Sequence, residues 1–584
     1  MRVVWVDLRV MLVENARLTE EKRTDAAEAR RSPWAGALEQ ALPHSCPDMM
    51  SSEPTIQWMP LTADWDYNEL VCREAVAAGV SAIQFSHRIC HGTAVLDDPA
   101  RRDHARKLLK LYTDAGMAVW CWIHEVEKPD LKFVKDGKLQ AADPDLYEAI
   151  EAKYDKFLAE TLPGLSGLIL TICETDFEIY MGDKAEGDIG GPERVRGIVD
   201  AVAAACRRHG SRLAVRDFLY RKSEVDLLRE MFQQLPEDII VMSKCVPQDW
   251  HVFYPPNPMI GDVGNREQWV EHDFGFEHEG QHLYPYADIE RIQERLRYEH
   301  ENGVRTWCLR LDRYNADKGY GALLNPWGRL ILRAVKQIIE DPDLELEHVW
   351  DDWERQQFIG ARTVLNIATE TVQSMLFSLG GMTHNHSRIP GYPYARSHIA
   401  RVDPANRPGD PQTASEKALA LAIDGLRRGW ANCDRVAGWT DSPEERAAEE
   451  AMESMTEECL EACLREADHM KTLALEAREC IEAIEDGGAE AEAWERAVEQ
   501  LVVWAYCFHA WKHAYFHVRR CQEHPSEELA KRCEKLIKTF EETCAEAAPA
   551  LEGLYLGDAP VCDNGKLAPD VAASLREALA CAVP

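Results

Sequence analysis

Three carboxylates of this sequence stand where apolar, strand-like runs end. Glu174 closes the run GLILTICE, Asp249 follows the run DIIVMSK, and Glu277 closes the run QWVEHDFGFE. Hydrolysis of a glycosidic bond needs at least two carboxyl groups, one protonated as an acid and one ionised. The residues before Glu174, LILTIC, are almost all apolar and favour its protonated form. The pattern predicts Glu174 as the general acid and Asp249 with Glu277 as the pair that activates a water, as in an inverting enzyme.

Two cations end neighbouring runs of the same kind, Arg216 and Lys244. A guanidinium holds a carboxylate through two hydrogen bonds and an ammonium adds a compact charge, so this pair suits an acidic sugar. The alternative is that both cations only neutralise nearby carboxylates and stiffen the rim. The full set of predicted substrate-binding residues is Arg216, Lys244, His124, Glu125, Trp250 and His384.

Eight short apolar runs, which alternate with amphipathic segments, must position these residues. The runs cover residues 55–61, 81–87, 118–125, 167–174, 212–218, 238–244, 268–277 and 305–312. This alternation is typical of βα units on a parallel sheet. It predicts an α/β fold, a (β/α)8 TIM barrel over residues 53–345, in which catalytic groups lie at the carboxyl-terminal ends of the strands.

The remaining segments have different patterns. Residues 1–52 are charged and weakly patterned, and we expect a poorly ordered tail. Residues 346–412 combine a helix with a Gly-, Pro- and His-rich stretch, which we expect near the barrel mouth. Residues 413–584 have helical periodicity and predict an α-helical carboxyl-terminal domain.

Composition restricts the classes of partner. Lys and Arg total 66 against 101 Asp and Glu, and the resulting formal charge of -35 repels nucleic acids and anionic membrane surfaces. The 18 cysteines are scattered without a C-x-x-C pair, which favours free thiols in a reducing cytoplasm. No apolar run approaches the roughly 20 residues that span a bilayer.

Four segments occur in a fixed order along the predicted barrel: GLILTICE, VRDFLY, KCVPQDW and FEHEGQ. They resemble, in turn, the acid-bearing strand, the W-R-x-F-V-Y strand, the K-N-G-P-I-D-F segment and the Q-E-Y-x-G-Q segment of glycoside hydrolase family 67, the α-glucuronidases. The interval of 28 residues from Asp249 to Glu277 is also similar to that of the family. The resemblance covers roughly residues 55–355, with Val215 and Cys245 where the family has Trp and Asn.

The resemblance implies removal of an α-linked uronic acid from an acidic oligosaccharide, with inversion, without a cofactor and without a metal. It implies that Glu174 is the general acid, that Asp249 and Glu277 activate water, and that Arg216 and Lys244 grip the sugar carboxylate. It also implies that the helical domain packs on the barrel and supports a homodimer.

Two other functions stay open on the residues alone. Barrels of metal-dependent sugar isomerases and epimerases gather Glu, Asp and His at strand ends in the same way. A catalytically silent glycan-binding protein would keep the barrel and the two cations. Metal dependence separates the first alternative from a hydrolase, and the presence of all three carboxylates argues against the second.

Three histidines repeat at four-residue intervals in the helical region, His509, His513 and His517. They share one helix face, where they could bind a metal ion. No carboxylate or thiol is interleaved between them, and the neighbours are aromatic. We therefore expect a buried packing or dimer surface there and no metal.

Overall fold

The computed structural model describes the greater part of the chain. The described residues are 65–85, 99–126, 129–172, 177, 185–186, 191–218, 223–246, 256–273, 279–280, 283–309, 325–378, 381–384, 387–398, 455–484, 488–556, 559–563 and 566–582.

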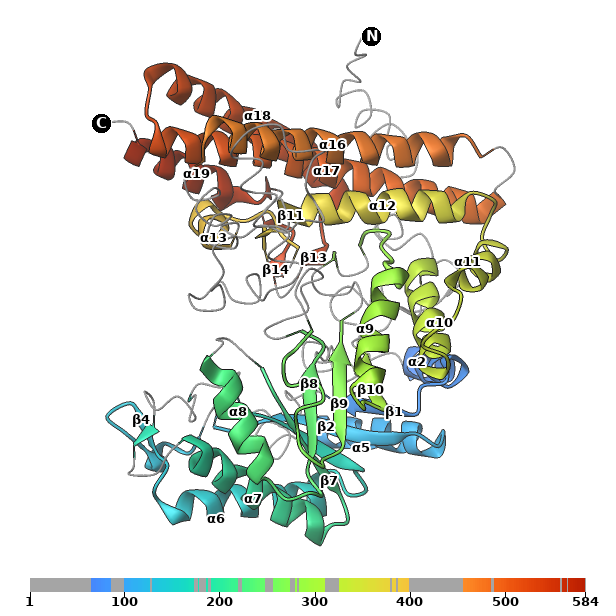
Figure 1. Cartoon of the computed structure of the whole chain (residues 1–584), viewed down its shortest axis with the longest axis vertical. Helices are drawn as coiled ribbons and strands as arrows, with labels where there is room; N and C mark the ends of the chain where they lie inside the picture. Colours follow the sequence, from blue (N-terminus) through green and yellow to red (C-terminus); the bar gives the residue numbers. More distant parts are fainter. Residues whose placement is uncertain are drawn as a thin grey trace.

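A seven-stranded parallel sheet forms the centre of the amino-terminal part (Figure 1). Its strands, in spatial order, are β1 (Ala82–Phe85), β2 (Ala118–His124), β5 (Gly167–Thr171), β7 (Arg212–Arg216), β8 (Ile240–Lys244), β9 (Gln268–His272) and β10 (Thr306–Leu309). Spatial order equals chain order, as expected when each strand is followed by a crossover to its next neighbour. Seven of the eight predicted strands are confirmed, and the first, 55–61, lies outside the described residues.

The sheet is curled, so that strands far apart in its order meet across its inner face. Trp120 of β2 and Trp269 of β9 pack edge to face with ring centroids 4.7 Å apart. The thiol of Cys308 in β10 lies 3.8 Å from the amide oxygen of Gln84 in β1, although these are the two end strands. Gly167 makes room for this packing, since a Cβ there would lie 2.2 Å from the Trp120 ring.

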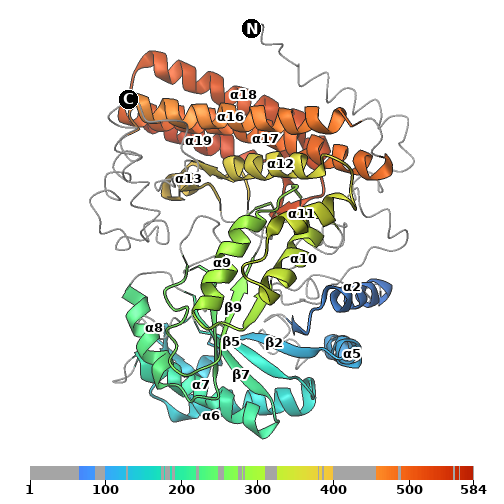
Figure 2. The same ribbon diagram turned by 45° about the vertical axis from the view of Figure 1, so that its right-hand side comes forward.

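Helices cover the outer face of the sheet (Figure 2). They are α2 (Trp65–Ala78), α5 (Pro99–Asp114), α6 (Pro144–Lys156), α7 (Gly191–Arg208), α8 (Ser223–Gln234), α9 (Ile289–Glu301) and α10 (Pro326–Glu340), with a π-helical turn η4 (Phe157–Thr161) after α6. The last of these helices, α10, packs against the first, α2, so the two ends of the helix layer are in contact. Asn325 caps α10 through its side chain, and Pro326 follows at the first helical position, as the capping rules predict.

Small elements fill the loops of the sheet unit. They are the 3-10 turn η3 (Leu131–Phe133) and a three-stranded sheet of β3 (Val134–Lys135), β4 (Lys138–Gln140) and β6 (Ala185–Glu186).

A helical layer forms the carboxyl-terminal part, as the sequence predicts (Figure 1). Its helices are α12 (Ala361–Leu376), α13 (Tyr392–His398), α16 (Glu457–Glu482), α17 (Gly488–Glu523), α18 (Glu527–Leu551) and α19 (Pro569–Ala582), and α11 (Leu346–Glu354) leads into it. Three two-stranded pieces accompany these helices: β11 (Phe377–Ser378) with β12 (Gly381–Met382), β13 (Tyr555–Leu556) with β14 (Ala559–Pro560), and β15 (Cys562–Asp563) with β16 (Lys566–Leu567).

An aromatic cluster joins the helical layer to the sheet unit. Trp494 of α17 packs edge to face on Trp327 of α10, Trp353 of α11 and Phe358, at centroid distances of 5.4, 5.9 and 5.9 Å. Aromatic side chains bury large apolar areas, so this cluster holds the two parts in a fixed relation.

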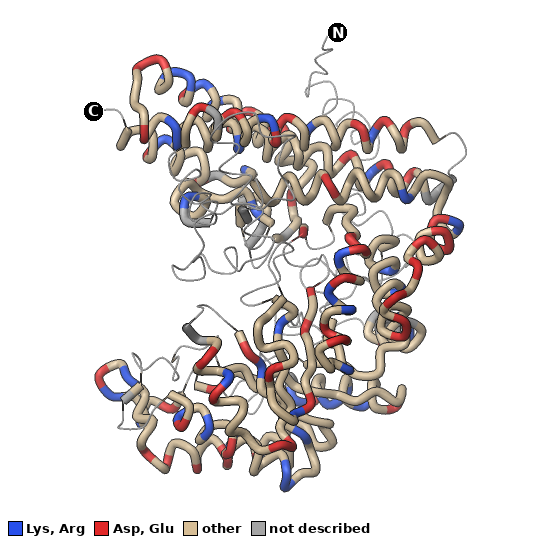
Figure 3. Tube along the Cα trace, in the orientation of Figure 1, with Lys and Arg blue, Asp and Glu red and all other residues tan. Residues whose placement is uncertain are grey.

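Charges of both signs are spread over the outer helices of both parts (Figure 3). Within the described residues, the helices lack the combination of length and apolar character that crossing a bilayer requires. The cysteines described there are not in disulfides.

Candidate active site at the carboxyl-terminal edge of the sheet

Side-chain alternation decides which residues face the inside of the curled sheet. The inner cluster contains Trp122, Ile169, Ala214, Met242 and Trp269, one from each of five neighbouring strands. Residues two positions further along face the same way. The inner residues at the carboxyl-terminal edge are therefore His124, Thr171, Arg216, Lys244 and Glu271, and strand pairing aligns His124 with Thr171, Thr171 with Arg216, and Lys244 with Glu271.

Arg216 and Glu271 form a fully buried ion pair at this edge. The Arg216 Nε donates to Oε2 of Glu271 at 2.6 Å, and the side chains are 1% and 0% exposed. The guanidinium also lies 4.9 Å from the centroid of the Trp122 ring. A guanidinium carries five N–H donors, so the bond to Glu271 uses one of them. Among the described residues, the second oxygen of Glu271, Oε1, has no hydrogen-bond partner.

Lys244 is the second buried cation of the edge. Its Nζ lies 4.1 Å from the centroid of the Phe218 ring. Its backbone N–H donates to Oδ1 of Asp217, which also accepts from Nδ2 of Asn257, both at 3.2 Å. Burial raises the pKa of Asp217 to about 6. Asp217 thus ties the end of β8, which carries Lys244, to the end of β7, which carries Arg216.

Trp122 of β2 provides an aromatic surface on the inner face of the sheet, near its carboxyl-terminal edge. Its indole Nε1 donates to Oγ1 of Thr171 at 2.6 Å, which fixes the ring orientation. The half-buried His124 ring stands edge to face on it, with centroids 4.8 Å apart. His124 and Arg216 therefore both adjoin the Trp122 ring. A sugar-binding surface with one aromatic and one cationic side would need such an arrangement.

Glu125 lies on the other face of the sheet. Its Oε2 accepts from the Tyr154 hydroxyl at 2.6 Å and from Lys153 Nζ at 3.1 Å, both on α6. Its Oε1 accepts from the backbone N–H of Val126 at 3.2 Å. Since neighbouring strand residues face opposite ways, His124 and Glu125 cannot serve the same site. The structure does not bring Glu125 together with the inner group.

The segment that carries His384 approaches the loop after β9. The backbone N–H of Gly280 donates to Oγ of Ser387 at 2.9 Å, and the His384 ring stacks on Tyr394 with centroids 4.3 Å apart. Gly280 has a φ of +95°, and a Cβ there would lie 2.0 Å from the Tyr284 ring. Only glycine therefore allows this close approach.

The four other predicted site residues, Glu174, Asp249, Trp250 and Glu277, lie outside the described residues. The strands that precede them, β5, β8 and β9, are in place and run parallel.

Glu279 is a buried carboxyl that the sequence analysis missed. Burial first, and then the charge of Asp273, hold the pKa of Glu279 well above its ordinary value, while Arg295 acts in the opposite direction. The sequence signal was its place in FEHEGQ, two residues after Glu277 and directly before Gly280.

The buried pair of Arg216 and Glu271 gives a prediction on stability. Arg216→Met leaves the Glu271 charge buried without its partner, and we expect a loss of about 3–5 kcal/mol in the free energy of unfolding. Arg216→Met combined with Glu271→Leu replaces the pair by apolar groups and should recover most of that loss. Urea unfolding of the three proteins measures it, and additive losses in the double variant would contradict the pairing.

Comparison with known proteins supports the fold. The chain matches no family model and no curated protein sequence. Among solved structures it is similar to a GH138 enzyme targeting pectin rhamnogalacturonan II, with a TM-score of 0.55 and 11% identity over 92% of this chain and 83% of that one.

Two further neighbours are more distant. An O-GlcNAc hydrolase variant of Thermobaculum terrenum matches with a TM-score of 0.41 and 11% identity over 88% of this chain and 91% of that one. The enzyme CpGH84B matches with a TM-score of 0.36 and 11% identity over 87% of this chain and 74% of that one. The first comparison shows that the chain has a fold found in glycoside hydrolases.

Proposed function

We propose that this protein is a glycoside hydrolase that removes an α-linked uronic acid from an acidic oligosaccharide with inversion of configuration. The observation that carries the proposal is the pair of buried cations, Arg216 and Lys244, which lie at the ends of the adjacent strands β7 and β8 and face the inside of the curled sheet. We also propose that the chain is a divergent relative of glycoside hydrolase family 67. The predicted strand 55–61 is proposed to close the barrel.

The electrostatics of the chain explain why buried cations matter. With a formal charge of -35, the molecule as a whole repels an acidic sugar. Inside the curled sheet, away from water, an attraction between opposite charges is stronger than at the surface. At the inner edge, Arg216 and Lys244 outnumber the carboxylate of Glu271, which is paired with Arg216. In the proposal, this local excess of positive charge offsets the overall repulsion and gives the site its preference for a carboxylate.

The strand order suggests the roles of the acids. Glu174 follows β5, Asp249 follows β8 and Glu277 follows β9, while β7 with Arg216 lies between β5 and β8. In the proposed complex the sugar carboxylate meets Arg216 and Lys244 between the two groups of acids. Glu174 protonates the leaving oxygen from one side, and Asp249 with Glu277 takes a proton from the attacking water on the other.

The metal-dependent isomerase is less favoured. Such enzymes hold a divalent ion with carboxylates and imidazoles at the strand ends. Here two cationic side chains, from the adjacent strands β7 and β8, face the inside of that edge and would oppose binding of the ion. A reducing cytoplasm, in which the cysteine thiols stay reduced, is also part of the proposal.

The test is product analysis in chelator. The full chain, in excess EDTA, is given α-linked glucuronosyl and galacturonosyl oligosaccharides and fragments of pectin rhamnogalacturonan II, the target of the GH138 neighbour. We expect release of a free uronic acid from at least one of them. Turnover that needs a divalent metal, or an isomerised sugar as product, would replace this proposal with the isomerase.

A further inference from the structure

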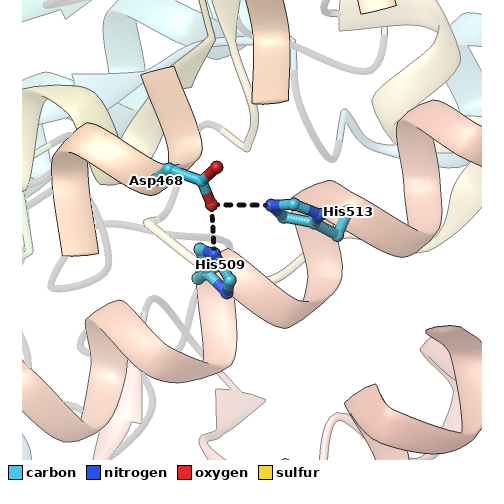
Figure 4. A group of neighbouring side chains, drawn as sticks. All are labelled: Asp468, His509 and His513. Atoms are coloured by element: carbon cyan, nitrogen blue, oxygen red, sulfur yellow. Dashed lines mark hydrogen bonds and ion pairs between the residues drawn. The ribbon is translucent and has the colours of Figure 1, made fainter. Parts of the chain in front are cut away.

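A carboxylate and two imidazoles meet between α16 and α17 of the helical layer (Figure 4). Asp468 lies on α16, and His509 and His513 lie one helical turn apart on α17. Oδ1 of Asp468 is 2.7 Å from Nε2 of His509 and 3.1 Å from Nε2 of His513. These ligand atoms all lie within 4.8 Å of one another.

The third histidine of the repeat is not part of this cluster. His517 is buried, and its Nδ1 is hydrogen-bonded to the backbone oxygen of His513 at 2.7 Å. Burial lowers the pKa of His517 to about 4, so it stays neutral. Its ring stacks on that of His513, which limits rotation of the His513 side chain.

The donor set fits one chemical class of ligand. Two imidazole nitrogens and one carboxylate oxygen are ligands that zinc and similar divalent transition-metal ions prefer. Bonds of about 2.0–2.2 Å in tetrahedral geometry place neighbouring ligand atoms about 3.4 Å apart. The two contacts of 2.7 and 3.1 Å would need to open by about 0.7 and 0.3 Å to reach that separation and admit an ion.

Exposure also suits an ion. The Asp468 side chain is 62% exposed and the two imidazoles are about one-fifth exposed, so water has access to complete the coordination. The ammonium charge of Lys471, on α16, opposes an ion at this site.

We propose that Asp468, His509 and His513 form a binding site for a zinc-like divalent ion that clamps α16 to α17. The site lies in the helical layer and is independent of the hydrolysis proposed for the sheet. Its ligands come from two different helices, α16 and α17, so an ion would stabilise their packing directly.

The test is cobalt titration of the full chain, purified without a histidine tag and stripped with chelator. We expect one equivalent of Co²⁺ with a d–d absorption typical of nitrogen and oxygen ligands, displaced by Zn²⁺. Asp468→Asn and His513→Phe keep side chains of similar size and should each weaken binding at least about tenfold. The matched control is His469→Ala, which removes a neighbouring exposed histidine bonded to Glu370 and should change nothing.

Three results would overturn the proposal: no binding at one equivalent, binding unchanged in both variants, or a sulfur-to-metal band that places cobalt on a cysteine. Circular dichroism of each variant checks the helices. Asp468→Asn is nearly isosteric and exposed, so it keeps the test decisive even where His513→Phe perturbs folding.

Discussion

Glu174→Gln is expected to lower the rate of uronoside hydrolysis by about 10²–10⁴-fold, the usual contribution of a positioned general acid. Gln keeps the size of the side chain but has no proton to give to the leaving oxygen. The measurement is kcat on the best substrate of the panel. A substrate whose leaving group needs no protonation should lose much less, because the acid then contributes little.

The matched control for that variant is Glu267→Gln. Glu267 directly precedes β9, at the opposite end of the strand from Glu277, and pairs with Arg212 at the surface. Its replacement should leave the rate unchanged. A rate for Glu174→Gln within about threefold of the unmodified protein would remove Glu174 from the role of acid, whatever the control does.

Lys244→Met is expected to reduce the preference for an acidic sugar. A hydrogen bond to a charged group contributes roughly 1.5–3 kcal/mol, which corresponds to about a tenfold to hundredfold loss in kcat/KM for the uronoside. The methyl ester of the same uronoside has no charge and should be affected much less. Met also packs well against an aromatic ring such as Phe218, so the fold should persist.

Lys153→Met is the control for Lys244. Lys153 pairs with Glu125 on the outward face and is 27% exposed. Its loss should alter stability slightly and leave the ratio of kcat/KM between acid and ester unchanged. Equal losses on the acid and on the ester in Lys244→Met would show that Lys244 supports the strand end and does not select the carboxylate.

The strands of the sheet were predictable because their residues are buried on both faces. Runs such as AVWCWIH and GLILT are continuously apolar, as parallel strands require, and the structure places strands there. The predicted ends were too long by up to five residues, as in QWVEHDFGFE, where β9 ends at His272. The sequence after a strand does not show at which residue the hydrogen bonding to the neighbouring strand stops.

Which face a residue takes was harder to predict. Glu125 was grouped with His124 because both end the same run, yet adjacent strand residues face opposite sides and Glu125 is bound to α6. Glu271 was overlooked because candidates were sought only at the ends of runs. The same alternation, counted from Trp269, would have placed Glu271 inside with Arg216.

Contacts between distant helices could not be predicted at all. The spacing of His509 and His513 indicated a shared face, but the missing carboxylate comes from Asp468 on α16. Spacing rules apply within one helix, and the packing of α16 on α17 is fixed only by the folded core.

Proton NMR of the reaction in chelator tests the central claim most directly, because it identifies the sugar released and its first anomer together. With an α-linked uronosyl oligosaccharide, the proposed inverting mechanism predicts that the β-anomer of the free uronic acid appears first and that the α-anomer grows in by mutarotation. Early α-anomer would contradict inversion and make one of the carboxylates a nucleophile. Absence of any free uronic acid across the panel would contradict the proposed hydrolysis itself.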